Sequence, residues 1–600
     1  MIWLQYSKLM EYGNTLFTQT LKKIDRERRI KKELIVGFDT EFDSKTDELL
    51  SVQFSCGDNV KLYEINQKEF FWDDLWNLVL DFLDEVGIDY SHRKVRDIYL
   101  VCFWSIAELH HIRDLHTAGY IGENITYNVS KKFGSRYLHV LDLYQFFKGS
   151  LAKVAELFGY RKFDYDTSNI TRADLKKKEF REYAVHDAFL TEKIYNDFRE
   201  LIWSKYKVDI LASKSVANTS MTIFRKNFLT EKVGNKRTKV RKLGLLCSWG
   251  GCNMAFVRGD FKGDFYLYDA NSMYPNSAIQ LGILPREKDW IFTSDLDEFL
   301  KGVGGICNVW FKFPENEKYP CLPVFNDGKL CYPLSGRSHC TLEEVRFALK
   351  CGAEIRLKES YYYIDGNSDL QEYLKELLRK KNSSKGVERA FYKLMMNSII
   401  GKFTQKILKT DINDYMKHAQ DFGVSFSELS GIKNLKLKKK VNTGSGFCPE
   451  WNTLILGYAR ATQNMAFREN NAYVGTTDSL VIKGEIKNKI VNGLDYEFEG
   501  KGKRLICLKT RVYALIDDDK NIIHLAHHGI HTRKGLVGLM EKGLVDGLAL
   551  YDVDKIIKLR QSIRTEYDFG ESVRKNMRFN GVWDDKRRLL DNGFTVPYNK

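Results

Sequence analysis

Tyr268-Asp-Ala-Asn-Ser-Met-Tyr-Pro275 is the stretch around which the rest of the chain is best understood. The residues that lead into it, Asp264-Phe-Tyr-Leu-Tyr268, form an aromatic and apolar run that predicts a β-strand. Asp269 therefore stands where a strand ends, and we expect the chain to turn at Pro275. A carboxylate at a strand end, next to backbone N–H groups, suits a divalent cation that carries a phosphate. Asp269 is equally compatible with an ordinary turn, so the segments before and after it decide between the two interpretations.

The charge of the chain points to a polyanionic partner. The 600 residues carry a net charge of +15, and a chain of this length is expected to form about three or four domains. Nucleic acid is favoured over a membrane because the sequence lacks a lipid-anchor motif and any apolar run of about 18 residues. Met1–Lys8 lacks the apolar core and cleavage site of a signal peptide. We therefore expect a protein that is not secreted and has no transmembrane segment.

The cysteines indicate free thiols. All eleven are scattered without CxxC pairs, which argues against a disulfide framework and against a zinc site. Five of them fall between Cys307 and Cys351, with His339 nearby. We still expect thiols in a reducing compartment.

A pair of acidic residues follows the first predicted strand. In Glu33-Leu-Ile-Val-Gly-Phe-Asp-Thr-Glu-Phe-Asp43, the apolar run Leu34–Phe38 predicts a buried strand. Asp39 and Glu41 are two residues apart and would share one face of that strand. Two carboxylates on one face repel each other, which a metal site would explain. Leu50–Ser55, with its period-two alternation, predicts the next strand.

A second acidic motif lies on a predicted helix. Arg181–Ala188 is helical in pattern, so Tyr183 and Asp187, four apart, meet on one face. A metal-binding carboxylate and a phenol that orients water are parts of a two-metal phosphodiester hydrolase. The chain here resembles the tyrosine-type 3′→5′ exonucleases with four carboxylates, through Asp39-x-Glu41 and Tyr183-x-x-x-Asp187. His186 stands one place before the Asp and is interpreted as incidental.

Two further exonuclease motifs match less well. The family pattern Asn-x-x-(Phe/Tyr)-Asp is best matched by Trp104-Ser-Ile-Ala-Glu108, in which Glu108 would supply the remaining carboxylate. A solvated helical residue is the alternative for Glu108. Ser150-Leu-Ala-Lys-Val154 matches the family pattern that grips single-stranded ends, so Ser150 and Leu151 are predicted DNA contacts.

Downstream of Asp269, a basic column is predicted on a helix. Tyr373 to Phe403 reads as a pair of helices, and Arg389, Lys393 and Asn397 follow one another at intervals of four. Two cations and an amide in a column, with Lys381 nearby, fit a triphosphate. A solvated helix face is the alternative.

Two strand patterns complete the series. Tyr473–Lys483 predicts strand, tight turn and strand, with Asp478 at the tip, facing Asp269 across a pair of metal ions. Leu505–Leu515 predicts one further strand, with Arg511 and Tyr513 on one face.

The order of these pieces resembles the family B DNA polymerases over essentially the whole chain. The family sequence is Asp-x-x-Ser-hydrophobic-Tyr-Pro, then Lys-x-x-x-Asn-Ser-x-x-Gly, then Thr-Asp-Ser in a hairpin, then a basic-x-Tyr strand. The resemblance implies an α/β multidomain fold, with a ribonuclease H-like 3′→5′ exonuclease followed by a right-hand polymerase of palm, fingers and thumb that carries two insertions. It also implies two Mg²⁺ or Mn²⁺ ions per active site, a DNA template and primer, and dNTPs.

The resemblance assigns roles to individual residues. Asp269 and Asp478 would hold the polymerase metals, and Asp39, Glu41 and Asp187, with Glu108, those of the exonuclease, where Tyr183 would orient the water. Tyr274 would exclude a 2′-hydroxyl, while Lys381, Arg389, Lys393 and Asn397 would bind the nucleotide. DNA contacts are implied for Trp249, Gly250, Gly251, Thr477, Arg511 and Tyr513.

The chain departs from the family pattern at several positions. Trp249-Gly-Gly251 matches the motif Tyr-x-Gly-Gly only in part, and a simple turn explains the two glycines equally well. Thr476 stands where the hairpin usually has its first Asp, and Ile400 replaces a Tyr. Arg511 replaces a Lys. Because Asp269 and Asp478 remain, we expect activity to survive.

Inserts at two places resemble the protein-primed branch of family B, which viruses, virophage-like elements and linear plasmids carry. One insert has a predicted hairpin turn at Asn326-Asp-Gly328, and the other contains the alternating basic segment Gly431–Lys440. A terminal protein would then supply the priming hydroxyl, and the enzyme, expected to be a monomer, would act in the cytoplasm or nucleus of a host cell, or in a virion. The implied boundaries are a basic extension (1–32, helical from 14), exonuclease (33–205), palm (206–285), first insertion (286–360), fingers (361–404), second insertion (405–450), palm (451–535) and thumb (536–600).

Two alternatives stay open. One is a family B polymerase that uses a nucleic-acid primer. The other is a catalytically weakened DNA-binding scaffold that retains the exonuclease, which Thr476 and Ile400 motivate.

Overall fold

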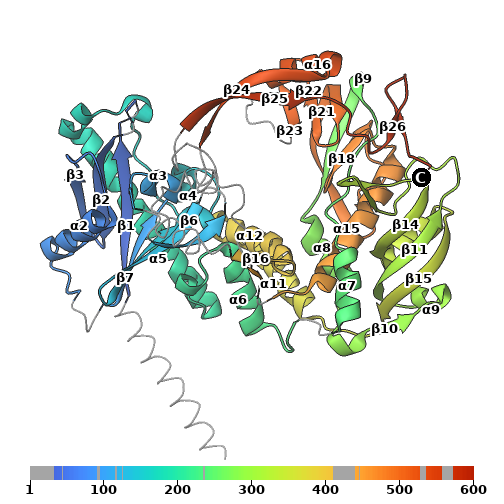
Figure 1. The fold of residues 1–600 in the computed structure, drawn as a ribbon, viewed down its shortest axis with the longest axis horizontal. Coiled ribbons are helices and arrows are strands. Elements are labelled where there is room, and N and C mark those ends of the chain that lie inside the picture. The colour runs from blue at the N-terminus through green and yellow to red at the C-terminus, as the bar shows by residue number, and fades with distance from the viewer. Residues whose placement is uncertain are drawn as a thin grey trace, which may run out of the picture. The chain divides into compact units, whose positions relative to one another are not determined.

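The computed structural model describes residues 33–599 except 44, 47, 91–94, 115–117, 124–125, 234–236, 410–439, 445, 528–534 and 557–571 (Figure 1). The chain divides into two compact units. The first contains the described residues up to Thr219, and the second contains most of those from Ser220 onward. The predicted basic helix over 14–32 and the alternating segment 431–440 lie outside the described residues.

The first unit is built on a seven-stranded mixed sheet with the strand order β3-β2-β1-β4-β7-β6-β5. β1 is parallel to β4, and β4 to β7, while the outer strands are antiparallel. The strands are β1 (Glu33–Phe42), β2 (Leu49–Cys56), β3 (Asn59–Glu64), β4 (Asp97–Cys102), β5 (Gly119–Glu123), β6 (Thr126–Phe133) and β7 (Arg136–Asp142). The helices are α2 (Trp72–Glu85), α3 (Ser105–Leu109), α4 (Leu151–Leu157) and α5 (Lys178–Tyr206).

Helices cover this sheet on both sides. Val52 and Phe54 of β2 belong to the apolar cluster that includes α2, while Ser55 on the other face donates to Glu192 of α5 at 2.6 Å. Every residue from Leu49 to Ser55 is therefore buried. The predicted strand is confirmed, and its apolar and polar residues are both buried because the sheet is covered on both faces.

A glycine lets α5 approach β1 closely. A Cβ atom at Gly37 would lie 2.0 Å from the carbonyl oxygen of Ala188 on α5. Real Cβ atoms essentially never come this close to other atoms, so a larger residue would push α5 outward. Gly37 thus brings Asp187, the neighbour of Ala188, up to the strand that carries Asp39.

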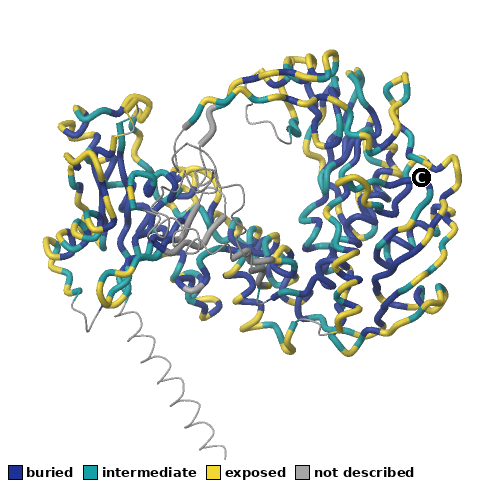
Figure 2. The backbone as a smooth tube through the Cα atoms, viewed as in Figure 1, coloured by how far each residue is buried: buried dark blue, intermediate teal, exposed yellow. Residues whose placement is uncertain are grey.

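The second unit is built on an antiparallel sheet with the strand path β23-β22-β21-β9-β19-β18-β8, with β20 paired to β21 outside that path. Its strands are β8 (Asn253–Ala255), β9 (Gly259–Ala270), β18 (Val474–Thr476), β19 (Ser479–Lys483), β20 (Ile490–Val491), β21 (Leu494–Lys509), β22 (Val512–Ile516) and β23 (Ile522–His527). Three helices, α7 (Thr238–Leu246), α8 (Met273–Leu281) and α15 (Pro449–Asn470), pack together, and α15 is buried along most of its length (Figure 2).

The region predicted as the first insertion contains a four-stranded sheet with the order β10-β15-β11-β14. It comprises β10 (Ile291–Thr293), α9 (Leu296–Leu300), β11 (Gly304–Lys312), β14 (Ser335–Thr341), α10 (Leu342–Lys350) and β15 (Glu354–Tyr363). A hairpin of β12 (Val324–Asn326) and β13 (Lys329–Cys331) turns at Asp327 and Gly328, with φ of 47° and 77°. Positive φ at both positions is the type I′ geometry, which confirms the predicted Asn-Asp-Gly turn.

The remaining elements of the second unit include a pair of helices and several two-stranded sheets. The helices α11 (Asp369–Ser383) and α12 (Gly386–Lys402) pack on each other, as expected. The others are α6 (Val216–Asn227), β16 (Lys406–Lys409), β17 (Lys440–Thr443), α16 (Leu536–Asp546), β24 (Leu548–Ile556), β25 (Ser572–Asn580), β26 (Arg588–Leu589) and β27 (Thr595–Val596). Near the C-terminus the chain returns to the end of β8 in the large sheet, where Thr595 N donates to the carbonyl oxygen of Phe256 at 2.9 Å.

Two local predictions are wrong. Pro275 lies inside α8 rather than in a turn, because Ser272, with a left-handed φ of 46°, already redirects the chain one residue before the helix starts. Leu505–Leu515 forms two strands rather than one, because Lys509 pairs with Val512 and the chain turns at Thr510 and Arg511.

All eleven cysteines are free thiols. None of the helices in the described part of the chain combines the length and the apolar character that crossing a membrane requires.

Candidate active sites

The first unit gathers four carboxylates from three elements. Asp39 and Glu41 lie on β1, Glu108 on α3 and Asp187 on α5, and all four side chains are buried. Burial raises the pKa of Asp39 well above its ordinary value, and the charges of the other three carboxylates raise it further. Burial, followed by the charge of Asp187, raises the pKa of Glu41 to about 8. Each carboxylate thus disfavours the charged form of its neighbours. A bound cation would stabilise these charged forms.

Glu108 faces the cluster although its motif matches the family poorly. Its Oε2 accepts a hydrogen bond of 2.7 Å from Thr40 Oγ1, between the two acids of β1. Asp142, at the end of β7, holds the start of α3 by accepting from the backbone N–H groups of Trp104 and Ser105 at 2.9 and 2.8 Å. The alternative of a solvated helical residue is therefore wrong for Glu108, which is 6% exposed.

A pocket of about 400 Å³ opens onto three of the carboxylates. Ser150 and Leu151, the predicted contacts for a single-stranded end, line it together with the rings of Phe103, Trp104 and Tyr144. Ser150 also caps α4, with its hydroxyl accepting from Lys153 N at 3.4 Å. The aromatic walls and the acidic floor give the pocket the two surfaces that a nucleotide end requires.

Lys162 is a residue of this site that the sequence analysis missed. Its ammonium group pairs with Asp187 Oδ2 and lies 5.0 Å from the ring centre of Tyr183. Lys162 sits in a segment without a repeating pattern, so no periodicity could have revealed it. His186 points elsewhere, with Nε2 2.8 Å from the carbonyl oxygen of Arg161, in line with its predicted incidental role.

The carboxylate oxygens of the cluster are suitable ligands for a divalent cation, but the side chains would have to move closer to one another to bind it. Among the residues that the structure describes, no three acidic, histidine or cysteine side chains come close enough to hold one metal ion. Asp187 Oδ1 is nevertheless buried without a hydrogen-bond partner. Carboxylate oxygens that lack partners are the ligands that Mg²⁺ and Mn²⁺ prefer.

In the second unit, the two acids of the predicted polymerase site meet on neighbouring strands. Asp269, on β9, lies directly across from Ser479 of β19, and Asp478 is the residue before Ser479 in the hairpin turn. Ala270 N donates to Asp478 O at 2.7 Å, which joins the turn to the end of β9. Burial, then the charge of Asp478, raises the pKa of Asp269 to about 7. The predicted convergence of Asp269 and Asp478 is confirmed.

β21 adds two acids that the sequence analysis missed. Glu497 is the partner of Asp269 across the β9–β21 pair, and the charges of both Glu497 and Glu499 raise the pKa of Asp269. The signal was present in the sequence, because Glu497-x-Glu499 has the same spacing as Asp39-x-Glu41.

Thr476 belongs to a hydroxyl network. Its Oγ1 lies 2.7 Å from Ser479 Oγ, and both hydroxyls face the hydroxyl of Tyr513. The Tyr513 hydroxyl is also 3.3 Å from His524 Nε2. Tyr513 is fully buried beneath the hairpin, whereas Arg511 is exposed in the turn before β22. The prediction that Arg511 and Tyr513 share one strand face is wrong because the chain reverses between β21 and β22.

α12 presents the predicted basic column. Arg389, Lys393 and Asn397 are all exposed on this helix. Lys393 lies near enough to Asp269 to lower its pKa. Lys381, on α11, is buried, and its pKa is lowered by burial and then by the charges of Lys393 and Arg389. Three cations held close together, with one of them facing an acid, fit an anionic ligand better than an ordinary solvated face.

The Trp-Gly-Gly segment touches the catalytic turn. A Cβ atom on Gly251 would lie 2.8 Å from Tyr274 Oη and 2.9 Å from Thr477 Cγ2. Thr477 has a left-handed φ of 40°, which is unusual for a β-branched residue and makes the turn depend on its neighbours. The close approach that the paired glycines predict therefore exists, and it is to Tyr274 and Thr477.

Replacing Gly251 by alanine is expected to slow the primer extension predicted from the sequence by about a hundredfold, because displaced reacting groups cost about this much per ångström. Gly250→Ala is the matched control, since nothing lies within 4 Å of a Cβ at that position. Single-turnover primer extension measures both. Equal rates for the two variants would contradict the role of the close contact.

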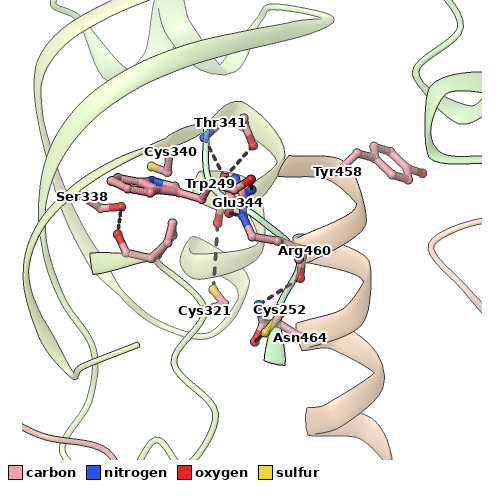
Figure 3. A network of polar contacts seen from close by, with 12 residues as sticks. Trp249, Cys252, Cys321, Ser338, Cys340, Thr341, Glu344, Tyr458, Arg460 and Asn464 are labelled. Atoms are coloured by element: carbon pink, nitrogen blue, oxygen red, sulfur yellow. Dashed lines mark hydrogen bonds and ion pairs between the residues drawn. The ribbon is translucent and has the colours of Figure 1, made fainter. Parts of the chain in front are cut away.

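A buried ion pair supports the same segment (Figure 3). Arg460 of α15 pairs with Glu344 of α10 at 2.7 Å, and both side chains are fully buried. Arg460 Nη1 also donates to the carbonyl oxygens of Trp249 and Gly250 at 2.9 and 3.3 Å. Glu344 in turn accepts from Thr341 N and Oγ1, both at 2.9 Å. The region predicted as the first insertion is thus joined to α15 and to the Trp-Gly-Gly segment through fully buried charged groups.

Glu344→Ala should destabilise α10 and α15 by about 3–5 kcal/mol, because it leaves a buried guanidinium without its counter-charge. Glu343→Ala, which removes the partly exposed partner of Arg346, should cost at most about 1 kcal/mol. Native-state hydrogen exchange of the two helices gives the opening free energies. A small change for Glu344→Ala would mean that Arg460 finds another partner or water.

Comparison with known proteins points to one family. The family described as DNA polymerase type B, organellar and viral, matches residues 165–446, which is less than half of the chain. Over this region the chain is similar to the type B DNA polymerases. The matched region includes Asp269 and the basic column of α12.

Two relatives of this chain carry DNA polymerase names. It is 22% identical over 447 residues to the probable DNA polymerase of Podospora anserina, covering 65% of this chain and 36% of the relative. It is 25% identical over 304 residues to the primer-independent DNA polymerase PolB of Escherichia coli, covering 42% of this chain and 35% of the relative. These matches therefore span only about a third of either relative's length.

Solved structures confirm the predicted fold class. The chain superimposes on Phi29 DNA polymerase in complex with primer-template DNA and an incoming nucleotide, with a TM-score of 0.63. The match covers 91% of this chain and 99% of the other at 15% identity. The complex of Phi29 DNA polymerase with primer-template DNA alone gives a TM-score of 0.60 at 14% identity. The likeness establishes the multidomain fold with its exonuclease and polymerase parts.

Proposed function

We propose that this chain is a DNA-directed DNA polymerase with a 3′→5′ proofreading exonuclease. The observation that carries the proposal is the meeting of Asp269 and Asp478 on adjacent strands, with the cation of Lys393 beside them. Similarity to the type B DNA polymerase family over residues 165–446 and the fold shared with Phi29 DNA polymerase support the same conclusion.

In the polymerase site, each residue has a role that its position supports. Asp269 and Asp478, with Glu497 and Glu499 nearby, would hold two Mg²⁺ or Mn²⁺ ions, which lower the pKa of the primer hydroxyl and neutralise the triphosphate. Lys393, Arg389 and Lys381 bind the phosphates, and Asn397 extends the same column. Tyr274, packed on Gly251 and Thr477, lies under the sugar and excludes a 2′-hydroxyl. Tyr513 holds the hairpin that presents Asp478, and Trp249 lines the path of the DNA.

In the exonuclease site, the pocket receives a frayed 3′ end. Ser150 and Leu151 grip the terminal nucleotide, and Asp39, Glu41, Glu108 and Asp187 would bind the metal ions that activate a water and stabilise the leaving oxygen. Tyr183 orients that water. Lys162 holds Asp187 until a cation competes for its carboxylate.

The first test is extension of a labelled primer on a DNA template with dNTPs and Mg²⁺ or Mn²⁺. Extension supports the polymerase, and shortening of the primer when dNTPs are withheld supports the exonuclease. Shortening without extension in either metal would overturn the proposal and favour a scaffold that retains only the exonuclease.

We further propose that synthesis is primed by a protein hydroxyl and displaces the non-template strand. This rests on the insertion between β9 and α11 and on the family's organellar and viral character. The test supplies a linear template, labelled dNTP and proteins of the parent element, without an oligonucleotide primer. Label that survives nuclease but not protease supports protein priming. If label is incorporated without added proteins, and only into product that nuclease degrades, initiation would instead be primer-independent, as the name of the E. coli relative describes.

Metal binding at the exonuclease cluster should appear as a pH-dependent gain in stability. The carboxyl of Glu41, with a pKa raised from 4.5 to about 8, keeps a proton in the metal-free folded protein that the unfolded chain has released. Stability therefore falls as pH rises from about 4.5 to 8, by up to about 1.4 kcal/mol per pH unit. Mg²⁺ should raise the melting temperature more at pH 8 than at pH 5. Glu41→Gln should weaken the dependence of stability on pH in the metal-free protein. An unchanged dependence would contradict the assignment of this effect to Glu41.

A further inference from the structure

The sheet of the first insertion has one face that no catalytic role explains. Its other face packs on α10, in an apolar cluster that includes Val309 and Phe311 of β11. Between these two residues Trp310 points the opposite way and is 53% exposed. Trp310 lies directly opposite Arg337 of β14 and Arg356 of β15. Because direct cross-strand partners share a face, the indole has a guanidinium-bearing residue on each side.

The surroundings of Trp310 are basic and partly pre-ordered. Arg337 Nε donates to Asn308 Oδ1 at 2.8 Å, which orients the guanidinium without neutralising it, because the amide is uncharged. The exposed side of the sheet carries four basic residues against two acidic ones: Lys312, Arg337, Arg356 and Lys358 against Glu354 and Glu359. We call Trp310, Arg337 and Arg356 the indole face.

We propose that the indole face binds single-stranded nucleic acid, with a base stacked on Trp310 and the flanking phosphates on Arg337 and Arg356. An aromatic side chain between cations matches the alternation of base and phosphate along a single strand. Protein interfaces are also enriched in Trp and Arg, but they are depleted in lysine, and Lys312 and Lys358 add two lysines to the same sheet.

The indole face is continuous with the polymerase site through β14. Two residues beyond Arg337, the carbonyl oxygen of His339 accepts a hydrogen bond of 2.7 Å from Trp249 Nε1. Trp249 leads to Gly251, which contacts Thr477 in the catalytic turn. A single-stranded nucleic acid that leaves this turn can therefore follow the edge of β14 to Trp310. The inference goes beyond the proposed function, because neither catalytic site includes these residues.

Photo-cross-linking tests the contact directly. The full chain is irradiated with an oligo(dT) that contains 5-iododeoxyuridine, in EDTA so that neither catalytic activity is required. The adduct is expected on the peptide that contains Trp310, to persist in Trp310→Phe and to be lost in Trp310→Ala. Phe292→Ala is the matched control, because Phe292 is 59% exposed on β10 of the same sheet. Absence of an adduct at Trp310 in the wild-type protein would overturn the proposal.

The salt dependence of binding separates stacking from phosphate contacts. Trp310→Ala should weaken oligo(dT) binding about tenfold with little change in the salt slope. Arg337→Gln with Arg356→Gln should lower the slope of log K against log salt by about 1.4, or about 0.7 per phosphate. Wild-type affinity and slope in both variants would overturn the proposal. If these variants bound DNA normally but failed in protein-primed initiation, the face would belong to a protein partner, and the proposal would fall.

Discussion

Replacing Asp478 by alanine is expected to reduce primer extension by at least about a thousandfold, while primer shortening continues at the wild-type rate. Asp478 stands beside Asp269 at the point where β9 meets the hairpin, and the loss of a metal-holding carboxylate removes several kcal/mol of transition-state stabilisation. Because the carboxylates of the exonuclease lie in the other unit, their activity should not change. Rapid-quench extension with excess enzyme measures the effect.

The control for this variant is Asp495→Ala. Asp495 is an exposed acid on β21 of the same sheet, so its loss changes the net charge equally without touching the pair. A wild-type rate for Asp495→Ala with a thousandfold loss for Asp478→Ala would place the chemistry at the hairpin. Retention of activity by Asp478→Ala would mean that Glu497 or Glu499 can replace it, and the assignment of Asp478 would be wrong.

Asp39→Ala is expected to lower primer degradation by about a thousandfold and to leave extension intact, with more mispaired ends in the product. The metal-free variant should not melt below the wild type, because burial and three neighbouring carboxylates already disfavour the charge of Asp39. An unchanged melting temperature therefore shows that the variant has lost activity without unfolding.

The matched control is Asp164→Ala, which removes an exposed acid from the same unit. Degradation of a single-stranded, 5′-labelled oligonucleotide without dNTPs measures the activity. Loss of both degradation and extension in Asp39→Ala would contradict two separate sites.

The chemistry of the polymerase site could be predicted from sequence because each motif is local. A strand that ends in Asp269, a hairpin tipped by Asp478 and a helix with cations four apart each place their side chains by backbone periodicity alone. The order of the motifs then indicated the family, and the family model that matches residues 165–446 supports it.

One error arose where a local pattern crossed a turn, and the sequence does not show that both faces of β2 are covered. The segment Thr510-Arg511 contains none of the Gly, Asn or Asp residues that usually mark a two-residue turn, so Leu505–Leu515 looked like one strand. β2 alternates in sequence, yet helices bury its polar side as well, and Ser55 is satisfied by Glu192 instead of water.

The sequence by itself determined the fold class, the two acidic sites and the basic column, because these depend on spacing along single strands and helices. Only the tertiary structure decided that Glu108 faces the exonuclease cluster, that Lys162 holds Asp187, and that Glu497 stands across from Asp269. It also decided that Arg460 and Glu344 join the insertion to the Trp-Gly-Gly segment. These partners lie far apart in sequence, and they meet because close packing, as between Gly37 and Ala188, sets the distance between elements that no periodicity records.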